Sequence, residues 1–216
     1  MKARPILMNT DMARATWDGR KTQTRRIMNP QPFDTDCEFI NEPPSGVACY
    51  SQQWKTFRDE DILDNSPFGK VGDLLYVRET LCNDGADSFF YKAGGQYTTE
   101  FTQEKLPSNW FIKSSIPSIH MPRWASRMTL EIEDIRVERL QDISEVDAKA
   151  EGAIYAPLLP QGGIDGCEKD DACMVSRFAA LWESINGKGS WQANPWVWAI
   201  TYKLHKCNVD TFLKEQ

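Results

Sequence analysis

The chain has 216 residues, 41% of them hydrophobic, and a formal net charge of -6 at pH 7. This length can bury a core of its own and no apolar run is long enough to span a membrane, so we expect one globular domain with no membrane role. The excess of acidic groups repels polyanions, which argues against extended binding of duplex DNA and leaves a local anion or nucleotide site open.

The start of the chain and its cysteines indicate a cytoplasmic protein. Residues 1–19 begin with basic side chains but hold no sustained apolar stretch, unlike a secretory signal. The six cysteines include no CxxC pair and are expected to be free thiols. There are two histidines, and the motifs of zinc hydrolases, serine hydrolases and zinc deaminases are missing, so we expect no metal and no other cofactor.

A group of positive charges follows the first predicted helix. Residues 9–19 predict this short helix, with Asn9 or Thr10 as its N-cap. The segment DGRKTQTRR, residues 18–26, then gathers one lysine and three arginines in an otherwise acidic chain. Alternation over residues 21–27 predicts a strand. Its two faces carry Thr22, Thr24 and Arg26 on one side and Lys21, Gln23 and Arg25 on the other.

The remaining elements indicate an α+β fold. The helix over residues 143–153 starts with a capping box of Ser144 and Asp147 and carries Glu151 in its last turn. A second helix is expected over 170–189. Strands are expected within residues 71–81, 88–95, 128–140 and 194–204. Several strands with few short helices favour a compact mixed β-barrel over alternating βαβ units.

Six segments of the chain resemble the ASCH-domain proteins encoded by tailed phages and prophages. They read GRKTQTRR, GDLLYVRET, IHMPRWASRMTLEI, ISEVDAKAEGA, FAALWESING and NPWVWAITYKL, and they span both ends of the chain. ASCH domains are similar to PUA domains, so the resemblance implies a PUA-like β-barrel that binds RNA or a modified nucleoside in a bacterial host cell. It also implies one domain over residues 1–216, with insertions at about 30–66 and 83–118.

Some small bacterial ASCH enzymes remove the acetyl group of N4-acetylcytidine with a lysine, a threonine and a glutamate. Their motif G-R-K-T-x-T-x-R is similar to residues 19–26, which places Lys21 and Thr24 at the lysine and threonine positions. Their A-x-x-E stretch resembles Ala148 and Glu151, although this match is looser. The present chain is much longer and its YVRET segment has no obvious counterpart, so the size of the substrate stays open.

These three side chains can divide the hydrolysis of an amide among them. A threonine hydroxyl becomes a nucleophile when a base takes its proton, and Lys21 can be that base if burial and neighbouring arginines lower its pKa. Glu151 would either hold the exocyclic amine of cytosine and donate a proton to it, or activate a water. Residues three apart on a strand face opposite sides, so Lys21 and Thr24 cooperate only if Lys21 belongs to the preceding turn.

Further candidates for contacts with a substrate lie along the whole chain. Arg78 and Glu79 are equally well explained by an ion pair with each other. Arg123 and Trp124 would either clamp and stack a base or cover the end of the barrel, and we prefer the second interpretation. The full set of expected substrate contacts is Arg20, Arg26, Arg78, Glu79, Arg123 and Trp124.

A simpler explanation exists for the main motif. Lysines and arginines on an exposed hairpin usually form a solvated face, which would account for residues 20–26. A glutamate in a last helical turn is usually a surface residue, because carboxylates are disfavoured at that end of the helix dipole. The family motif shifts the interpretation of Lys21 and Thr24 to a pocket, and leaves catalysis and binding about equally favoured.

Three functions compete for the same residues. The first is hydrolysis of an N4-acylated cytosine by Lys21, Thr24 and Glu151. The second is a non-catalytic module that binds RNA or a modified base. The third is a metal-independent ribonuclease, in which Lys21 and Arg26 stabilise the charge on the phosphorane.

Overall fold

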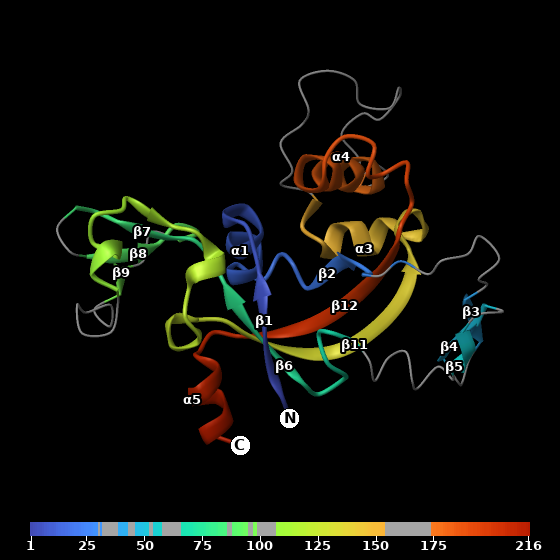
Figure 1. Cartoon of the computed structure of the whole chain (residues 1–216), viewed down its shortest axis with the longest axis horizontal. Helices are drawn as coiled ribbons and strands as arrows, with labels where there is room; N and C mark the ends of the chain where they lie inside the picture. The colour runs from blue at the N-terminus through green and yellow to red at the C-terminus, as the bar shows by residue number, and fades with distance from the viewer. Residues whose placement is uncertain are drawn as a thin grey trace. The chain divides into compact units, whose positions relative to one another are not determined.

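The computed structural model shows an α+β fold, in which sheets are combined with short helices (Figure 1). The predicted α+β class is confirmed, and the PUA-like barrel stays a prediction. Much of the predicted insertion at about 30–66, and part of that at about 83–118, lies outside the described residues. The structure describes residues 1–29, 31, 39–42, 46–51, 54–57, 66–85, 88–94, 97–98, 107–153 and 174–216.

The chain divides into two compact units, and each is described by itself. The first consists of residues 1–20, 72–132 and 203–216, and the second of residues 21–71 and 133–202. Strands β11 (Thr129–Arg139) and β12 (Trp196–His205) have residues in both units, so the partition does not by itself mark two domains. The organisation as a single domain stays a prediction.

The largest sheet has five strands in the order β1-β6-β11-β12-β2. Strand β1 (Ala3–Leu7) runs parallel to β6 (Leu74–Arg78), which pairs antiparallel with the start of β11. Strand β2 (Gln23–Ile27) pairs antiparallel with β12. Strand β2 carries Arg25 and Arg26 of the cluster of positive charges and lies at one edge of the sheet.

The first unit adds a smaller sheet and helices around its own core. This sheet has the order β10-β7-β8-β9. Its strands are β7 (Leu81–Asn83), β8 (Phe89–Tyr91), β9 (Tyr97–Thr98) and β10 (Ser115–Ile116). The helices are α1 (Thr10–Trp17), α5 (Val209–Lys214) and the 3-10 turns η1 (Ser108–Trp110), η2 (Ser118–His120) and η3 (Arg123–Ala125). One core cluster of this unit consists of Leu81, Phe89, Tyr91, Ile116, Met121 and Ala125.

The second unit contains the two helices that matter for the site. Helix α3 (Glu145–Ala150) contacts both α4 (Met174–Asn186) and β2 (Figure 1). The unit also holds the 3-10 turn η4 (Leu140–Asp142) and a three-stranded sheet of β3 (Phe39–Glu42), β4 (Gly46–Ser51) and β5 (Trp54–Phe57). Its core cluster consists of Leu140, Ile143, Ala148, Ala153, Met174, Phe178, Trp182 and Val197. This core fixes α3, and with it the residues at the end of α3.

The predicted caps account for where two helices begin and end. The Asn9 side chain accepts a hydrogen bond from the Met12 N–H at 2.8 Å at the start of α1. The Ser144 hydroxyl accepts one from the Asp147 N–H at 3.1 Å at the start of α3. Gly152 follows α3 with φ +84°, the left-handed conformation that ends helices. The capping predictions for both helices are therefore confirmed.

Two tryptophans of the last strand lie inside the protein. Trp196 and Trp198 on β12 are 8% and 5% exposed. This burial agrees with the expectation that the two rings pack inside the protein rather than stack on a base. No helix in the described part of the chain is long and apolar enough to cross a membrane.

Candidate active site

Lys21 lies in the turn before β2, as its cooperation with Thr24 requires. Strand β2 begins at Gln23, so Lys21 and Thr22 form the connection that leads into it. This connection is fixed from two sides, because the Thr22 N–H donates to the Ala150 carbonyl at 2.9 Å and the Tyr202 N–H donates to the Thr22 carbonyl at 3.0 Å. The end of α3 and strand β12 thus hold the backbone beside Lys21.

The Lys21 amine and the Glu151 carboxylate meet inside the protein. Lys21 Nζ lies 2.5 Å from Glu151 Oε2, and the two residues are 3% and 4% exposed. The amine also donates to the Gln23 carbonyl at 2.7 Å and to the Glu151 carbonyl at 3.0 Å. A lysine ammonium has three N–H donors, and these three acceptors satisfy all of them. The expected meeting of this lysine and glutamate, 130 residues apart, is therefore observed.

Arg25 holds the other oxygen of the same carboxylate. Its side chain is 0% exposed, and its Nη1 donates to Glu151 Oε1 at 3.3 Å. The same guanidinium contacts Glu138 on β11 at 2.5 Å and Asp147 on α3 at 3.3 Å. The guanidinium carbon of Arg25, Cζ, lies 5.9 Å from the centre of the Phe178 ring of α4, in the geometry of a cation–π contact. Three carboxylates therefore converge on one buried cation.

A second arginine supports two of these carboxylates from the outside. Arg136, on β11, contacts both Glu138 and Asp147 at 3.0 Å, and its side chain is 33% exposed. Gln23 donates to Asp147 Oδ1 at 3.1 Å and so adds a neutral partner to that carboxylate. The site is thus a connected network of charges, and Lys21, Glu151 and Arg25 are its most buried members.

Burial shifts the proton affinity of several groups in the network. It lowers the pKa of Lys21 below its ordinary value of 10.5, against the pull of Glu151, while Arg26 and Arg25 lower it further. Burial also lowers the pKa of Arg26. Partial burial acts to raise the pKa of Asp147, but Gln23 and the neighbouring arginines outweigh it and leave that pKa lowered. A lysine with a lowered pKa releases its proton more readily, as a general base must.

Thr24 and Arg26 belong to the other face of β2. Thr24 is 3% exposed and pairs with Ile200 of β12, and Arg26 pairs with Trp198. Successive residues of a strand face opposite sides, so these two side chains project away from the Arg25 side of the sheet. The structure brings Lys21 and Glu151 together, and the participation of Thr24 stays a prediction.

Glu79 pairs with Arg127, so the ion pair between Arg78 and Glu79, one of the two interpretations of these residues, is wrong. The Glu79 carboxylate, 0% exposed, accepts two hydrogen bonds from Arg127 at 2.8 and 2.9 Å. The Arg127 guanidinium lies 4.3 Å from the Trp17 ring and 4.1 Å from the Tyr91 ring. Burial raises the pKa of Glu79 despite this partner. The Arg78 side chain instead donates to the Ile119 carbonyl.

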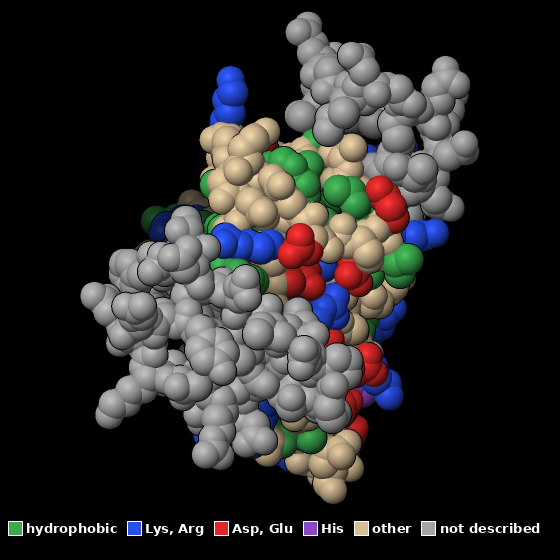
Figure 2. Space-filling view, turned by 90° about the vertical axis from the view of Figure 1, so that its right-hand side faces the viewer, with side chains coloured by type: hydrophobic (Ala, Val, Ile, Leu, Met, Phe, Trp, Pro, Cys, Tyr) green, Lys and Arg blue, Asp and Glu red, His purple; other side chains and the backbone are tan. Residues whose placement is uncertain are grey.

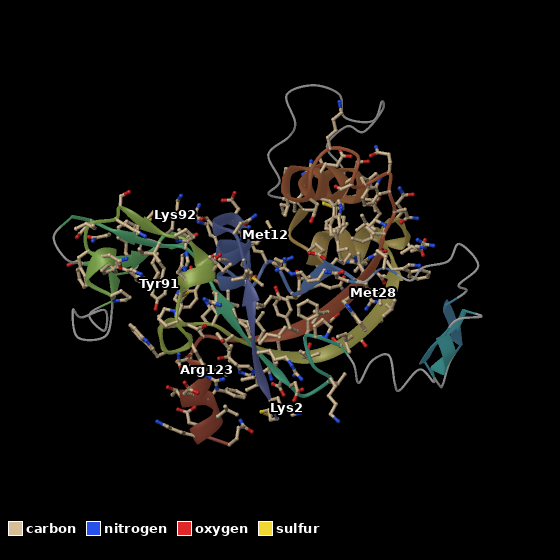
Figure 3. The ribbon with its side chains drawn as sticks, in the orientation of Figure 1. Lys2, Met12, Met28, Tyr91, Lys92 and Arg123 are labelled. Atoms are coloured by element: carbon tan, nitrogen blue, oxygen red, sulfur yellow. The ribbon has the colours of Figure 1, made fainter. Side chains whose placement is uncertain are left out.

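The other expected substrate contacts take part in packing. Arg123 lies beside α5, where it contacts Asp210 at 2.7 Å (Figure 3). Trp124 packs against the core cluster of the first unit. Arg20 contacts Asp18 at 2.7 Å, with its side chain 28% exposed. The solvated interpretation of the cluster is therefore wrong for the buried Lys21 and Arg25, and Arg20 is only partly exposed.

Asp147 and Glu138 were not among the site candidates from the sequence, and Arg25 was expected only as one of the arginines that lower the pKa of Lys21. The alternation along residues 21–27 placed Arg25 on the same face as Lys21, and this was the signal that could have found it. Within the described residues, no group of three or more histidine, cysteine or acidic side chains could hold a metal ion. Cys82 and Cys207 are unbridged, as expected for those two, and the other four cysteines lie outside the residues whose side chains are described.

The surface charge gives no sign of a large polyanion site on the face drawn in Figure 2. There, acidic and basic side chains of the described residues lie interleaved rather than as a continuous basic area.

The chain matches no family model, no curated protein and no solved structure. The functional argument therefore depends on the geometry of the described residues and on the resemblance of the six segments.

Proposed function

We propose that the chain is an ASCH-type protein with a PUA-like fold that hydrolyses the amide of an N4-acylated cytosine, in a nucleoside or an RNA base. The observation that carries this proposal is the buried pair of Lys21 and Glu151. Removing both charges from water costs several kcal/mol per ion. A fold that only needed a core could fill the same space with apolar residues, so the pair favours a chemical role.

The reaction adds one water to the acyl group and breaks its bond to nitrogen. Lys21, once deprotonated, takes a proton either from the attacking water or from the Thr24 hydroxyl, whose acyl ester a water then hydrolyses, and the resulting ammonium gives a proton to the leaving nitrogen. The carbonyl carbon gains the new oxygen, and the exocyclic nitrogen of cytosine leaves with a proton. Each carboxylate oxygen can accept two hydrogen bonds, so Glu151 has the capacity to bind this nitrogen while Lys21 and Arg25 keep their contacts. The products are the cytosine amine and a carboxylic acid.

The test is to incubate the purified chain with N4-acetylcytidine and to follow cytidine by chromatography. We expect turnover by the wild type and a loss of at least about 100-fold in Lys21→Arg, which keeps the charge but cannot serve as the base. Thr24→Val removes the hydroxyl at constant shape, and Thr24→Ser is its matched control. A large loss in the valine variant with activity kept in the serine variant identifies the hydroxyl as the reacting group.

Other results would replace this function. If the wild type gives no cytidine, the hydrolysis is wrong for this substrate. Cleavage of a labelled structured RNA that disappears in Lys21→Ala would establish the ribonuclease instead. Binding of RNA or of the nucleoside without either reaction would leave a binding module.

A further inference from the structure

We propose that Arg25 is a positioning residue that orients the Glu151 carboxylate against the Lys21 amine and tunes this pair electrostatically. Its catalytic meaning rests on the proposed function, whereas its effect on the pair can be measured without any substrate. Arg25 is not part of the motif that led to Lys21 and Thr24. The inference comes from the contacts of its buried side chain.

The geometry of Arg25 suits this task. Its guanidinium is planar and rigid, with five N–H donors that can contact several carboxylates in fixed directions. One of them reaches Glu151 Oε1 at 3.3 Å, while Lys21 contacts the other oxygen, Oε2, at 2.5 Å. Two cations therefore hold the two oxygens of one carboxylate. Rotation of the Glu151 side chain would break at least one of these contacts.

The partners of Arg25 come from three directions and fix it in turn. Glu138 approaches from β11 at 2.5 Å and Asp147 from α3 at 3.3 Å, and the Phe178 ring covers it from α4. Gln23 Oε1 also accepts from its Nη1 at 2.6 Å. A cation held this firmly cannot swing away when the charge on its neighbours changes.

Burial has the largest effect on how readily Lys21 loses its proton, and the charges that face it modify this effect. Glu151 at the end of α3 favours the ammonium, and Arg25 and Arg26 on β2 disfavour it. From β12, the Tyr202 hydroxyl donates to the backbone carbonyl of Lys21 at 3.2 Å, and not to its amine. If Arg25 were removed, Lys21 would lose a neighbour of like charge, while Glu151 would still favour its ammonium form. The protonated amine would therefore become more stable.

Arg25 would also stabilise the site during the reaction. When Lys21 is deprotonated, the Glu151 carboxylate loses the positive charge of its partner. The guanidinium of Arg25 still places a positive charge and an N–H donor against this carboxylate, and so holds it in place. The geometry thus separates two roles, with Lys21 exchanging the proton and Arg25 maintaining the field.

The test is a titration of the Lys21 side chain by NMR, in protein labelled with 13C at the lysine ε-carbon. Comparison with Lys21→Arg assigns the signal. In Arg25→Gln we expect the measured pKa of Lys21 to rise by about one unit or more. Arg25→Lys keeps the charge and is expected to stay close to wild type. Arg136→Gln is the matched control, because Arg136 shares Glu138 and Asp147 with Arg25; we expect less than half the shift of Arg25→Gln.

An unchanged Lys21 titration in folded Arg25→Gln would overturn the proposal, and so would an equal shift in Arg136→Gln. If Arg25→Gln does not fold, Asp147→Asn carries the test in the opposite direction. It removes an anion from Arg25, so the pKa of Lys21 is expected to fall, and a rise or no change would overturn the proposal. A merely structural Arg25 would lower stability without moving the titration.

The same variants separate this inference from the proposed function. Where the wild type hydrolyses N4-acetylcytidine, the rising limb of its pH–rate profile is expected to move to higher pH in Arg25→Gln. If the wild type is inactive and the titration still shifts, the proposed function fails and the positioning role stands. If hydrolysis occurs and the titration does not shift, the positioning role fails and the function stands.

Discussion

The buried pair predicts a specific pattern of stability in three variants. Lys21 and Glu151 side chains are 3% and 5% exposed, so removing one partner leaves a charge inside the protein. We expect Lys21→Met and Glu151→Leu each to lower the free energy of unfolding by about 3 to 5 kcal/mol. The lysine variant falls at the lower end, because Arg25 still contacts Glu151 at 3.3 Å. The double variant leaves neither charge unpaired and is expected to lose less than either single variant.

The pH dependence of this stability follows from the lowered pKa of Lys21. Between this lowered value and the ordinary value of 10.5, the unfolded chain binds more protons at Lys21 than the folded chain does. The free energy of unfolding contributed by Lys21 therefore rises as the pH rises through this window. Below this pH window the folded protein carries the full destabilisation from burying the charged ammonium. Above the window Lys21 is neutral in both states and this destabilisation is absent. Lys21→Met removes this slope and leaves the other alkaline titrations in place.

Urea unfolding followed by tryptophan fluorescence measures all three variants, and coincident circular dichroism curves check that unfolding is two-state. The coupling energy of the double-mutant cycle is expected to be at least about 2 kcal/mol. Losses below about 1 kcal/mol in both single variants would place the pair at the level of exposed ion pairs and refute the reasoning. So would a difference between wild type and Lys21→Met that does not change with pH.

Three further substitutions test contacts outside the network. Glu79→Gln removes a buried carboxylate from Arg127 and is expected to cost about 3 kcal/mol in urea unfolding; because burial raises the pKa of Glu79, the wild-type carboxyl contributes more stability as the pH falls through this pKa, so the loss grows in acid. Gly94→Ala places a Cβ 3.3 Å from Arg127 Nη1 and is expected to lower Tm by the equivalent of about 1 kcal/mol. Asn208→Ala removes the N-cap of α5 and a donor to three carbonyls, and about 2 kcal/mol is expected to be lost with faster amide exchange in α5. A wild-type unfolding midpoint in any of these variants contradicts the role given to that residue.

Features that depend on neighbouring residues could be predicted from the sequence. Asn9 and Ser144 cap helices because their side chains reach N–H groups two or three residues further on. Gly152 ends α3 because it adopts the left-handed conformation at little cost. Alternation along β2 was equally local. In each case the physical cause lies within one turn of helix or a few residues of strand.

The partners of the site residues could not be predicted in this way. Arg25 was assigned a face of β2, but the sequence does not show that α3 and α4 cover this face and supply Asp147 and Phe178. For the same reason an ion pair with the neighbouring Arg78 was one of two interpretations of Glu79, whereas its partner Arg127 lies 48 residues away. The sign of each charge can be read from a sequence. Whether a charged side chain faces solvent or pairs with a distant residue depends on tertiary packing.

The stability of the double variant decides whether the pair belongs to the fold or to its chemistry. Apolar replacements for a buried ion pair are often neutral or stabilising, because neither charge then has to be removed from water. If the Lys21→Met, Glu151→Leu variant is as stable as wild type and has lost hydrolysis, stability does not explain the pair and function does. If it is much less stable, Arg25 needs Glu151 to balance its charge beside Glu138 and Asp147, and the pair is then a structural part of the network.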